Sequence, residues 1–204
     1  VSGIHPLPAT PEPLDPQAKD SARFADNVYD PAFNNDSPTR GGLLGKLGID
    51  YRPSDGFQAA LFRGSNGTYY LAFRGTELFT KDMRPDIATD VHQARGYTTS
   101  QFEQAKDLAR RVKQRVSQLG GTLVLTGHSL GGGLAAAAAH ATGLAADLFN
   151  PSWLNERYSH GTPQNIRSFI TAGDELDALR RVVGGTVPGQ AIYRPRKYGC
   201  GAIS

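Results

Sequence analysis

The chain has 204 residues, of which 39% are hydrophobic and 20% are charged, a balance typical of one globular domain. Its formal net charge of +3 is too small to indicate a nucleic-acid-binding protein. No run approaches the roughly 20 apolar residues that a bilayer span needs, and the single cysteine, Cys200, has no partner for an intramolecular disulfide. We therefore expect a fold held together by burial and hydrogen bonds.

The N-terminal region divides into an arm and the start of a domain. Residues 1–14 are rich in proline, which predicts an extended arm because proline donates no backbone hydrogen bond. Residues 15–204 form the expected domain. Asp15 has the character of a helix N-cap and Pro16 that of a first helical residue, and apolar residues follow at helical spacing as far as Tyr29. This pattern predicts an amphipathic helix.

Two β-type runs, 57–63 and 69–74, come next in the chain. The five residues between them contain Asn66-Gly67, a dipeptide typical of hairpin turns. We expect the two runs to pair as antiparallel strands.

A long helix is predicted after residue 99. Ser100 and Glu103 form a capping-box pattern, and apolar residues then recur every three or four positions. Gly120-Gly121 marks the expected end of the helix, because glycine readily adopts the left-handed conformation that terminates helices.

The remaining strands have the character of a parallel sheet. Residues 122–126 are apolar or β-branched without alternation, as expected of a central strand buried on both faces. Further strands are predicted at 145–149, 166–171 and 190–194. The order of strands and helices predicts an α/β fold with a mostly parallel central sheet and helices on both faces.

The segment Gly127-His128-Ser129-Leu130-Gly131 matches the nucleophile-elbow pattern G-x-S-x-G, with a strand before it and an alanine-rich helix after it. Such a turn holds its serine in a strained conformation with the hydroxyl exposed, and leaves no room for side chains at the glycines. Ser129 is thus the candidate nucleophile, and the Leu130 N–H at the helix start a candidate oxyanion donor. The alternative is that Ser129 only occupies a strand-to-helix turn of an unrelated α/β protein.

Four stretches in this order, 71–76, 127–135, 149–150 and 170–174, resemble the class 3 (fungal-type) triacylglycerol lipase family and its bacterial relatives. The resemblance covers roughly residues 20–195. It implies an α/β-hydrolase fold and a serine hydrolase that cleaves lipid esters without a metal or cofactor. A peptidase or an acyltransferase on the same scaffold is the rival enzyme.

The resemblance also implies roles for particular residues. Thr76 would supply the second oxyanion donor beside Leu130, and Asp174 would be the acid that orients the catalytic base. Asp177 is a weaker candidate for the acid. The segment 77–97 would be either a movable lid or a plain surface loop.

The sequence differs from the family pattern in its catalytic histidine. In the family, the catalytic residues follow one another along the chain as serine, acid, histidine. All the histidines precede Asp174: His5, His92, His128, His140 and His160. Three explanations stay open: the chain ends before the catalytic histidine, His160 or His92 is recruited, or the protein is a catalytically dead binding module. The end of the chain, 199–204, has no closing helix, which favours the first. His128 is expected to point away from Ser129.

The elbow and the proline-rich leader also resemble the lipase domains of bacterial effectors that are injected into rival cells. This resemblance implies a phospholipid substrate, transient contact with a membrane surface, and an inhibitory or immunity protein as a partner. It also implies export without a cleaved signal peptide, since the chain shows none, and leaves the compartment open.

Overall fold

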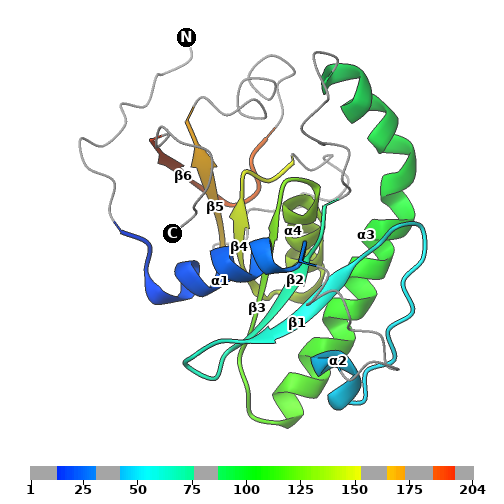
Figure 1. The fold of residues 1–204 in the computed structure, drawn as a ribbon, viewed down its shortest axis with the longest axis vertical. Helices are drawn as coiled ribbons and strands as arrows, with labels where there is room; N and C mark the ends of the chain where they lie inside the picture. Colours follow the sequence, from blue (N-terminus) through cyan, green and yellow to red (C-terminus); the bar gives the residue numbers. More distant parts are fainter. Residues whose placement is uncertain (1–12, 31–41, 76–86, 153–164, 173–185, 196–204) are drawn as a thin grey trace.

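A six-stranded sheet forms the centre of the computed structural model, which describes residues 13–30, 42–75, 87–152, 165–172 and 186–195, with 87–98 described by their backbone alone. The strands lie side by side in the order in which they follow along the chain (Figure 1). They are β1 (Ala59–Arg63), β2 (Tyr69–Phe73), β3 (Leu123–His128), β4 (Ala145–Phe149), β5 (Ile166–Thr171) and β6 (Gln190–Arg194). The bounds of the last three agree with the sequence prediction to the residue.

The pairing of the strands confirms the predicted sheet. β1 and β2 form the antiparallel hairpin that the Asn-Gly turn predicts. Every later pair of neighbours, from β2 with β3 to β5 with β6, is parallel.

Helices cover both faces of the sheet, as predicted (Figure 1). Helix α1 (Pro16–Asn27) crosses one face and contacts β2, β3 and β4. Helices α3 (Ile87–Gln118) and α4 (Leu130–Thr142) pack against each other on the opposite face. The short helix α2 (Leu43–Lys46), which the sequence did not predict, lies against β1.

Strand β3 shows why the sequence lacks alternation at this point. Leu123 and Leu125 pack into the core formed with α3 and α4, whereas Val124 packs with Phe24 of α1 on the other face. Both faces of β3 are therefore apolar and buried, as is usual for central strands of parallel sheets.

Helix α1 begins where the sequence predicts. Pro16 occupies its first turn, and the Asp15 carboxylate accepts a hydrogen bond from the Ala18 N–H at 2.8 Å. The side chains of Ala18, Ala22 and Ala25 are buried against the sheet. The small size of these alanines lets the helix approach the strands closely.

The predicted start of the long helix is wrong. Helix α3 begins at Ile87, thirteen residues before Ser100, and the Ser100 hydroxyl donates to the Asp55 carboxylate at 2.6 Å. The capping-box pattern was misleading because a tertiary hydrogen bond uses the serine. The predicted end is confirmed, since α3 stops at Gln118 and Gly120 has a φ of 67°.

This start also affects the segment considered as a lid. Residues 77–86 lie outside the described residues, and 87–97 form the first turns of α3. Within the part of the chain that the structure describes, no helix is both long and apolar enough to span a membrane.

Candidate active site

Ser129 lies at the sharp turn between β3 and α4, with φ 54° and ψ −124°. Residues other than glycine rarely adopt a positive φ, and such a conformation costs about 1–3 kcal/mol. The surrounding backbone fixes it: the Ser129 N–H donates to the Phe149 carbonyl at 3.1 Å, and its carbonyl accepts from the Ser152 N–H at 2.9 Å. The strained elbow expected from the sequence is therefore present.

The two glycines of the motif lie where no side chain fits. A Cβ atom on Gly127 would overlap the backbone of Gly131. A Cβ atom on Gly131 would overlap the Phe73 carbonyl at the end of β2 and lie 2.9 Å from the Gly75 nitrogen. The close approach of β2, β3 and α4 thus confirms the reason given for glycine at both positions.

The hydroxyl of Ser129 is not used to hold the fold together. It does not cap α4, and it makes no hydrogen bond to any described residue. The residue is 7% exposed, which is less than a hydroxyl standing free above the sheet would imply. Pro151 and Ser152 lie against the first turn of α4 and enclose this side of the elbow.

The start of α4 offers backbone donors next to Ser129. Leu130 is the first residue of the helix, and no described carbonyl accepts its N–H. The first N–H groups of a helix have no intrahelical partner, and the helix dipole adds positive potential there. This site suits the negative charge that forms on a carbonyl oxygen during acyl transfer.

The end of β2 touches the same elbow. A Cβ atom on Gly75 would lie 3.2 Å from the Gly131 nitrogen and 3.3 Å from the His128 carbonyl. The Gly75 N–H donates to the hydroxyl of Tyr29 at 3.0 Å. Thr76, the predicted second oxyanion donor, follows Gly75 in the chain but lies outside the described residues.

The predicted acid, Asp174, also lies outside the described residues, three positions after the end of β5. The described ends of β4 and β5 are tied together, because Asn150 accepts from the Thr171 N–H through its side chain at 2.7 Å. The carboxyl ends of parallel strands share one edge of a sheet. Ser129 and Asn150 follow β3 and β4 at that edge.

Of the five histidines, only His128 and His140 have described side chains. Side-chain alternation along β3 places His128 on the same face as Thr126, which is the α1 face. His140 lies ten residues beyond Leu130 in α4, about 15 Å along the helix axis. His92 is described by its backbone only, and His5 and His160 lie outside the described residues.

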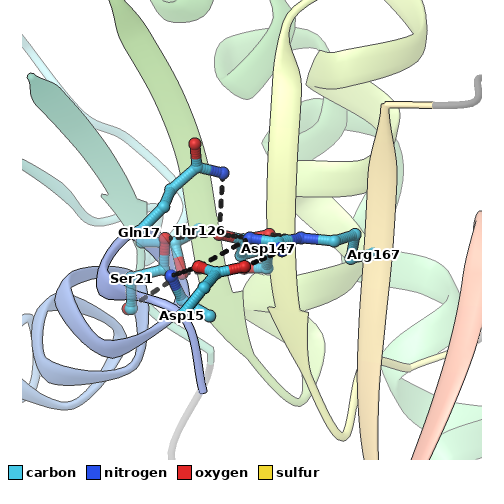
Figure 2. A network of polar contacts seen from close by, with 7 residues as sticks. Asp15, Gln17, Ser21, Thr126, Asp147 and Arg167 are labelled. Carbon is cyan, nitrogen blue, oxygen red and sulfur yellow. Dashed lines mark hydrogen bonds and ion pairs between the residues drawn. The ribbon is translucent and has the colours of Figure 1, made fainter. Parts of the chain in front are cut away.

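A network of charged and polar side chains joins α1 to the sheet (Figure 2). Asp147, 1% exposed in the middle of β4, accepts from Arg167 Nε at 2.7 Å and Nη2 at 3.0 Å, and from the Ser21 hydroxyl at 2.9 Å. Arg167 also pairs with Asp15, while the Thr126 hydroxyl donates to the Asp147 carbonyl at 2.8 Å. Sequence reasoning missed this network.

The contacts of this network indicate that it holds α1 to the sheet. The hydrogen bond from Arg167 lowers the pKa of the Asp15 carboxyl, and the hydrogen bond to Asp147 raises the pKa of Arg167. Asp147 uses its carboxylate oxygens on α1 and Arg167, so it is not available to orient a catalytic base. Among the described residues, no cluster of three or more histidine, cysteine or acidic side chains could hold a metal ion.

The sheet order, the helices on both faces and the strained serine after β3 together define an α/β-hydrolase fold. Solved structures agree. The MDLA N225Q mutant from Penicillium cyclopium matches with a TM-score of 0.54 and 18% identity, over 87% of this chain and 78% of that one. The Rhizomucor miehei lipase propeptide complex matches with a TM-score of 0.50 and 18% identity, over 86% of this chain and 65% of that one.

The family follows from the sequence comparison. The model of the Tle-like phospholipase domain matches residues 20–187, so the chain belongs to this phospholipase-like family. It is also similar to the extracellular phospholipase A1 of Serratia liquefaciens, with 42% identity over 118 residues. That match covers 56% of this chain and 34% of the relative, so the matched part spans about one third of that protein's length.

Proposed function

We propose that this protein hydrolyses carboxylic ester bonds of lipids, with phospholipids as the main substrate class and Ser129 as the nucleophile. The observation that carries the proposal is the strained Ser129 between β3 and α4, with a hydroxyl unbonded to described residues and the Leu130 N–H beside it. Membership of the Tle-like phospholipase family and the similarity to a phospholipase A1 support the substrate class.

The proposed reaction is acyl transfer to water. The Ser129 oxygen attacks the ester carbonyl while a histidine takes the hydroxyl proton, and the histidine then gives this proton to the departing alcohol. Water, deprotonated by the same histidine, releases the fatty acid from the acyl-enzyme and restores the serine. The Leu130 N–H and Thr76 stabilise the oxyanion, and each donor contributes about 2.7–4 kcal/mol to the transition state.

The acid and the base are assigned in different ways. Asp174 is proposed as the acid, because it follows the end of β5 and the resemblance to class 3 lipases leads us to expect the acid there. The base is a histidine whose side chain lies outside the described residues. His160 and His92 are the candidates that this chain offers.

Two further partners belong to the same proposal. Transient contact with a phospholipid surface would bring the ester bond to the elbow, since the substrate resides in a bilayer. An inhibitory or immunity protein would protect the producing cell, which the resemblance to injected lipase effectors supports.

The direct test is fatty-acid release from phosphatidylcholine vesicles. We expect Ser129→Ala to lower the rate by at least about 10³-fold. Ser117→Ala, which removes an exposed hydroxyl near the end of α3, is the matched control and should keep the wild-type rate. Full activity in Ser129→Ala would refute the assignment of the nucleophile.

The assignment of the acid is tested in the same assay. Asp174→Asn keeps the size of the side chain but removes its charge, and we expect a rate loss of about 10⁴-fold by analogy with other triads. Asp177→Asn tests the weaker candidate: a rate loss there, with an unchanged rate in Asp174→Asn, would assign the acid to Asp177 instead. Substitution of His92 and His160 by alanine, one at a time, would then identify the base if it lies in this chain.

A hydrolase-fold binding protein is the second candidate, because all five histidines precede Asp174. It predicts that the protein binds phosphatidylcholine vesicles without releasing fatty acid, and that Ser129→Ala binds equally well. Comparing vesicles with triglyceride emulsions and short nitrophenyl esters separates phospholipase activity from general esterase or acyltransferase activity.

A further inference from the structure

Tyr29, just beyond the end of α1, reaches the strand end that leads to the proposed oxyanion hole. Its hydroxyl accepts a hydrogen bond from the Gly75 N–H at 3.0 Å. Gly75 follows β2 and precedes Thr76, the proposed second oxyanion donor. The Tyr29 hydroxyl therefore bonds to the residue before that donor.

The space at this point is closely filled. A Cβ atom on Gly75 would lie 2.8 Å from the Tyr29 hydroxyl oxygen, 3.2 Å from the Gly131 nitrogen and 3.3 Å from the His128 carbonyl oxygen. Three separate segments thus meet around Gly75: the end of α1, the end of β3 and the start of α4. A shift of the Tyr29 hydroxyl would allow the Gly75 peptide to move relative to the elbow.

Tyr29 is itself held in place by its neighbours. The Arg74 guanidinium lies over the Tyr29 ring at 5.4 Å, and Arg74 also donates to the Gln58 side chain at 2.6 Å. Val28, the preceding residue, is fully buried, and the Phe24 ring stacks on Phe62 with centroids 4.7 Å apart. These contacts hold the C-terminal end of α1 against β1 and the end of β2.

The other end of α1 is held by the charged network (Figure 2). Ser21 donates to Asp147, and Asp15 pairs with Arg167. Helix α1 is thus fixed to β4 and β5 near its start and to the end of β2 at its finish. Its position determines where the Tyr29 hydroxyl lies.

We propose that Tyr29 is a positioning residue of the oxyanion hole: its hydroxyl holds the Gly75 peptide against the elbow, and this peptide leads directly into the proposed donor Thr76. The inference rests on the proposed role of Ser129. In this proposal Tyr29 acts through Gly75 rather than on the reacting atoms. Its loss is therefore expected to weaken transition-state stabilisation more than substrate binding.

The test compares Tyr29→Phe with Tyr70→Phe in the phosphatidylcholine assay. Both changes remove one phenolic hydroxyl on the α1 face of the protein, but the Tyr70 hydroxyl has no hydrogen bond of normal geometry to a described residue. Losing an oxyanion donor outright costs about 10²–10³-fold in kcat, so we expect Tyr29→Phe to lower kcat by about 10- to 100-fold. KM should stay within about twofold, and Tyr70→Phe should keep both constants within about twofold.

A second variant probes the same contact from the other side. Gly75→Ala displaces the Tyr29 hydroxyl and also crowds the Gly131 nitrogen and the His128 carbonyl, so it should lower kcat at least as much as Tyr29→Phe does, with little change in KM. Thermal unfolding of each variant, monitored by circular dichroism, distinguishes a local effect on kcat from loss of the fold.

The outcomes distinguish this inference from the proposed function. If Ser129→Ala abolishes hydrolysis while folded Tyr29→Phe keeps the wild-type kcat, the positioning role is wrong and the hydrolase proposal stands. A rise in KM at constant kcat would also overturn the inference, since it would assign Tyr29 to substrate binding. If Ser129→Ala is fully active, the proposed function itself fails.

Discussion

The two faces of the central sheet hold their helices by different means. On one face, α4 approaches β2 and β3 through glycine and alanine, and its contacts are set by backbone atoms such as the Phe73 carbonyl near Gly131. On the other face, α1 is held by a buried carboxylate, Asp147, and by the Arg167 guanidinium. The first face depends on shape, and the second adds a satisfied buried charge to the packing of the α1 alanines.

This difference predicts different responses to mutation. A face built from close backbone contacts cannot accept an added atom, because protein interiors are densely packed and backbone does not yield easily. A face built from a buried ion pair fails when one partner is lost, because the remaining charge is left in a poorly solvated site. The helices on both faces reach the elbow. Helix α4 begins there with Leu130, and Tyr29, just after α1, contacts Gly75 beside it.

The largest effect is expected on the face of close contacts. Gly131→Ala puts a Cβ atom into the Phe73 carbonyl, and we expect a loss of at least about 3 kcal/mol in the free energy of unfolding together with loss of activity. Gly120→Ala is the control: Gly120 has a φ of 67° and no atom within 4 Å of an added Cβ, so only about 1 kcal/mol is expected. Urea unfolding followed by far-UV circular dichroism measures both, and equal losses would contradict the steric explanation.

On the charged face, Asp147→Ala should cost about 3 kcal/mol, because Arg167 then loses both of its short hydrogen bonds to β4. The variant to compare with it is the double substitution Asp147→Leu with Arg167→Met. Removing both charges should restore the free energy of unfolding to within about 1 kcal/mol of wild type. If the double variant is less stable than Asp147→Ala, the face does not depend on charge pairing in the way described.

A smaller effect is expected from pH. Arg167 lowers the pKa of Asp15 from its ordinary value of 3.8, so the folded state favours the carboxylate. A carboxyl group with a lowered folded-state pKa stabilises the fold above its unfolded value and loses this contribution as the pH falls through the folded-state value. Asp15→Asn keeps the helix cap and removes the charge. Because the Asp15 side chain is half exposed, we expect the Asp15→Asn variant to be less stable than wild type by less than about 1 kcal/mol at about pH 6.

The control for this prediction is the same comparison of unfolding free energies at low pH. As the pH falls through the lowered pKa of Asp15, the carboxylate takes up a proton, so the difference in unfolding free energy between wild type and Asp15→Asn should shrink. High salt should also reduce the difference at about pH 6, because the pair is partly exposed. A difference independent of both pH and salt would show that the Arg167–Asp15 pair does not stabilise α1.

The smallest effect concerns an imperfection on the charged face. The Tyr70 hydroxyl is buried without a hydrogen bond of normal geometry to a described residue, and burial raises the pKa of this phenol against a smaller lowering by the Asn66 side chain. A buried polar group without a partner costs free energy, so Tyr70→Phe should leave the stability unchanged or raise it by up to about 1 kcal/mol. A loss above about 1 kcal/mol in urea unfolding would show that the hydroxyl makes a stabilising contact.

The sequence was sufficient where the structural signal is local. Strands β4 to β6 are short apolar runs bounded by turns, and the elbow follows from its glycines and the alanine-rich helix. The sequence pattern was misleading at the start of α3, because Ser100 forms a tertiary hydrogen bond with Asp55 that no local pattern reveals. The capping-box pattern therefore gave the wrong first turn.

The candidate site was accessible from sequence for the same reason. Ser129 and Leu130 belong to one contiguous motif, and the structure gives them the expected backbone geometry. The contacts of Tyr29 with Gly75 and of Ser21 with Asp147 join residues 46 and 126 positions apart, which no spacing rule connects. The roles of Thr76 and Asp174 stay predictions.

The most direct test of the central claim is covalent labelling of the folded protein with a fluorophosphonate probe, followed by peptide mass spectrometry. An activated serine attacks the probe, so we expect one adduct, on the peptide that contains Ser129, and none in Ser129→Ala. Ser117→Ala should label as wild type does. An adduct on another serine, equal labelling of Ser129→Ala, or no labelling of the folded wild-type protein would contradict the assignment of Ser129 as an activated nucleophile.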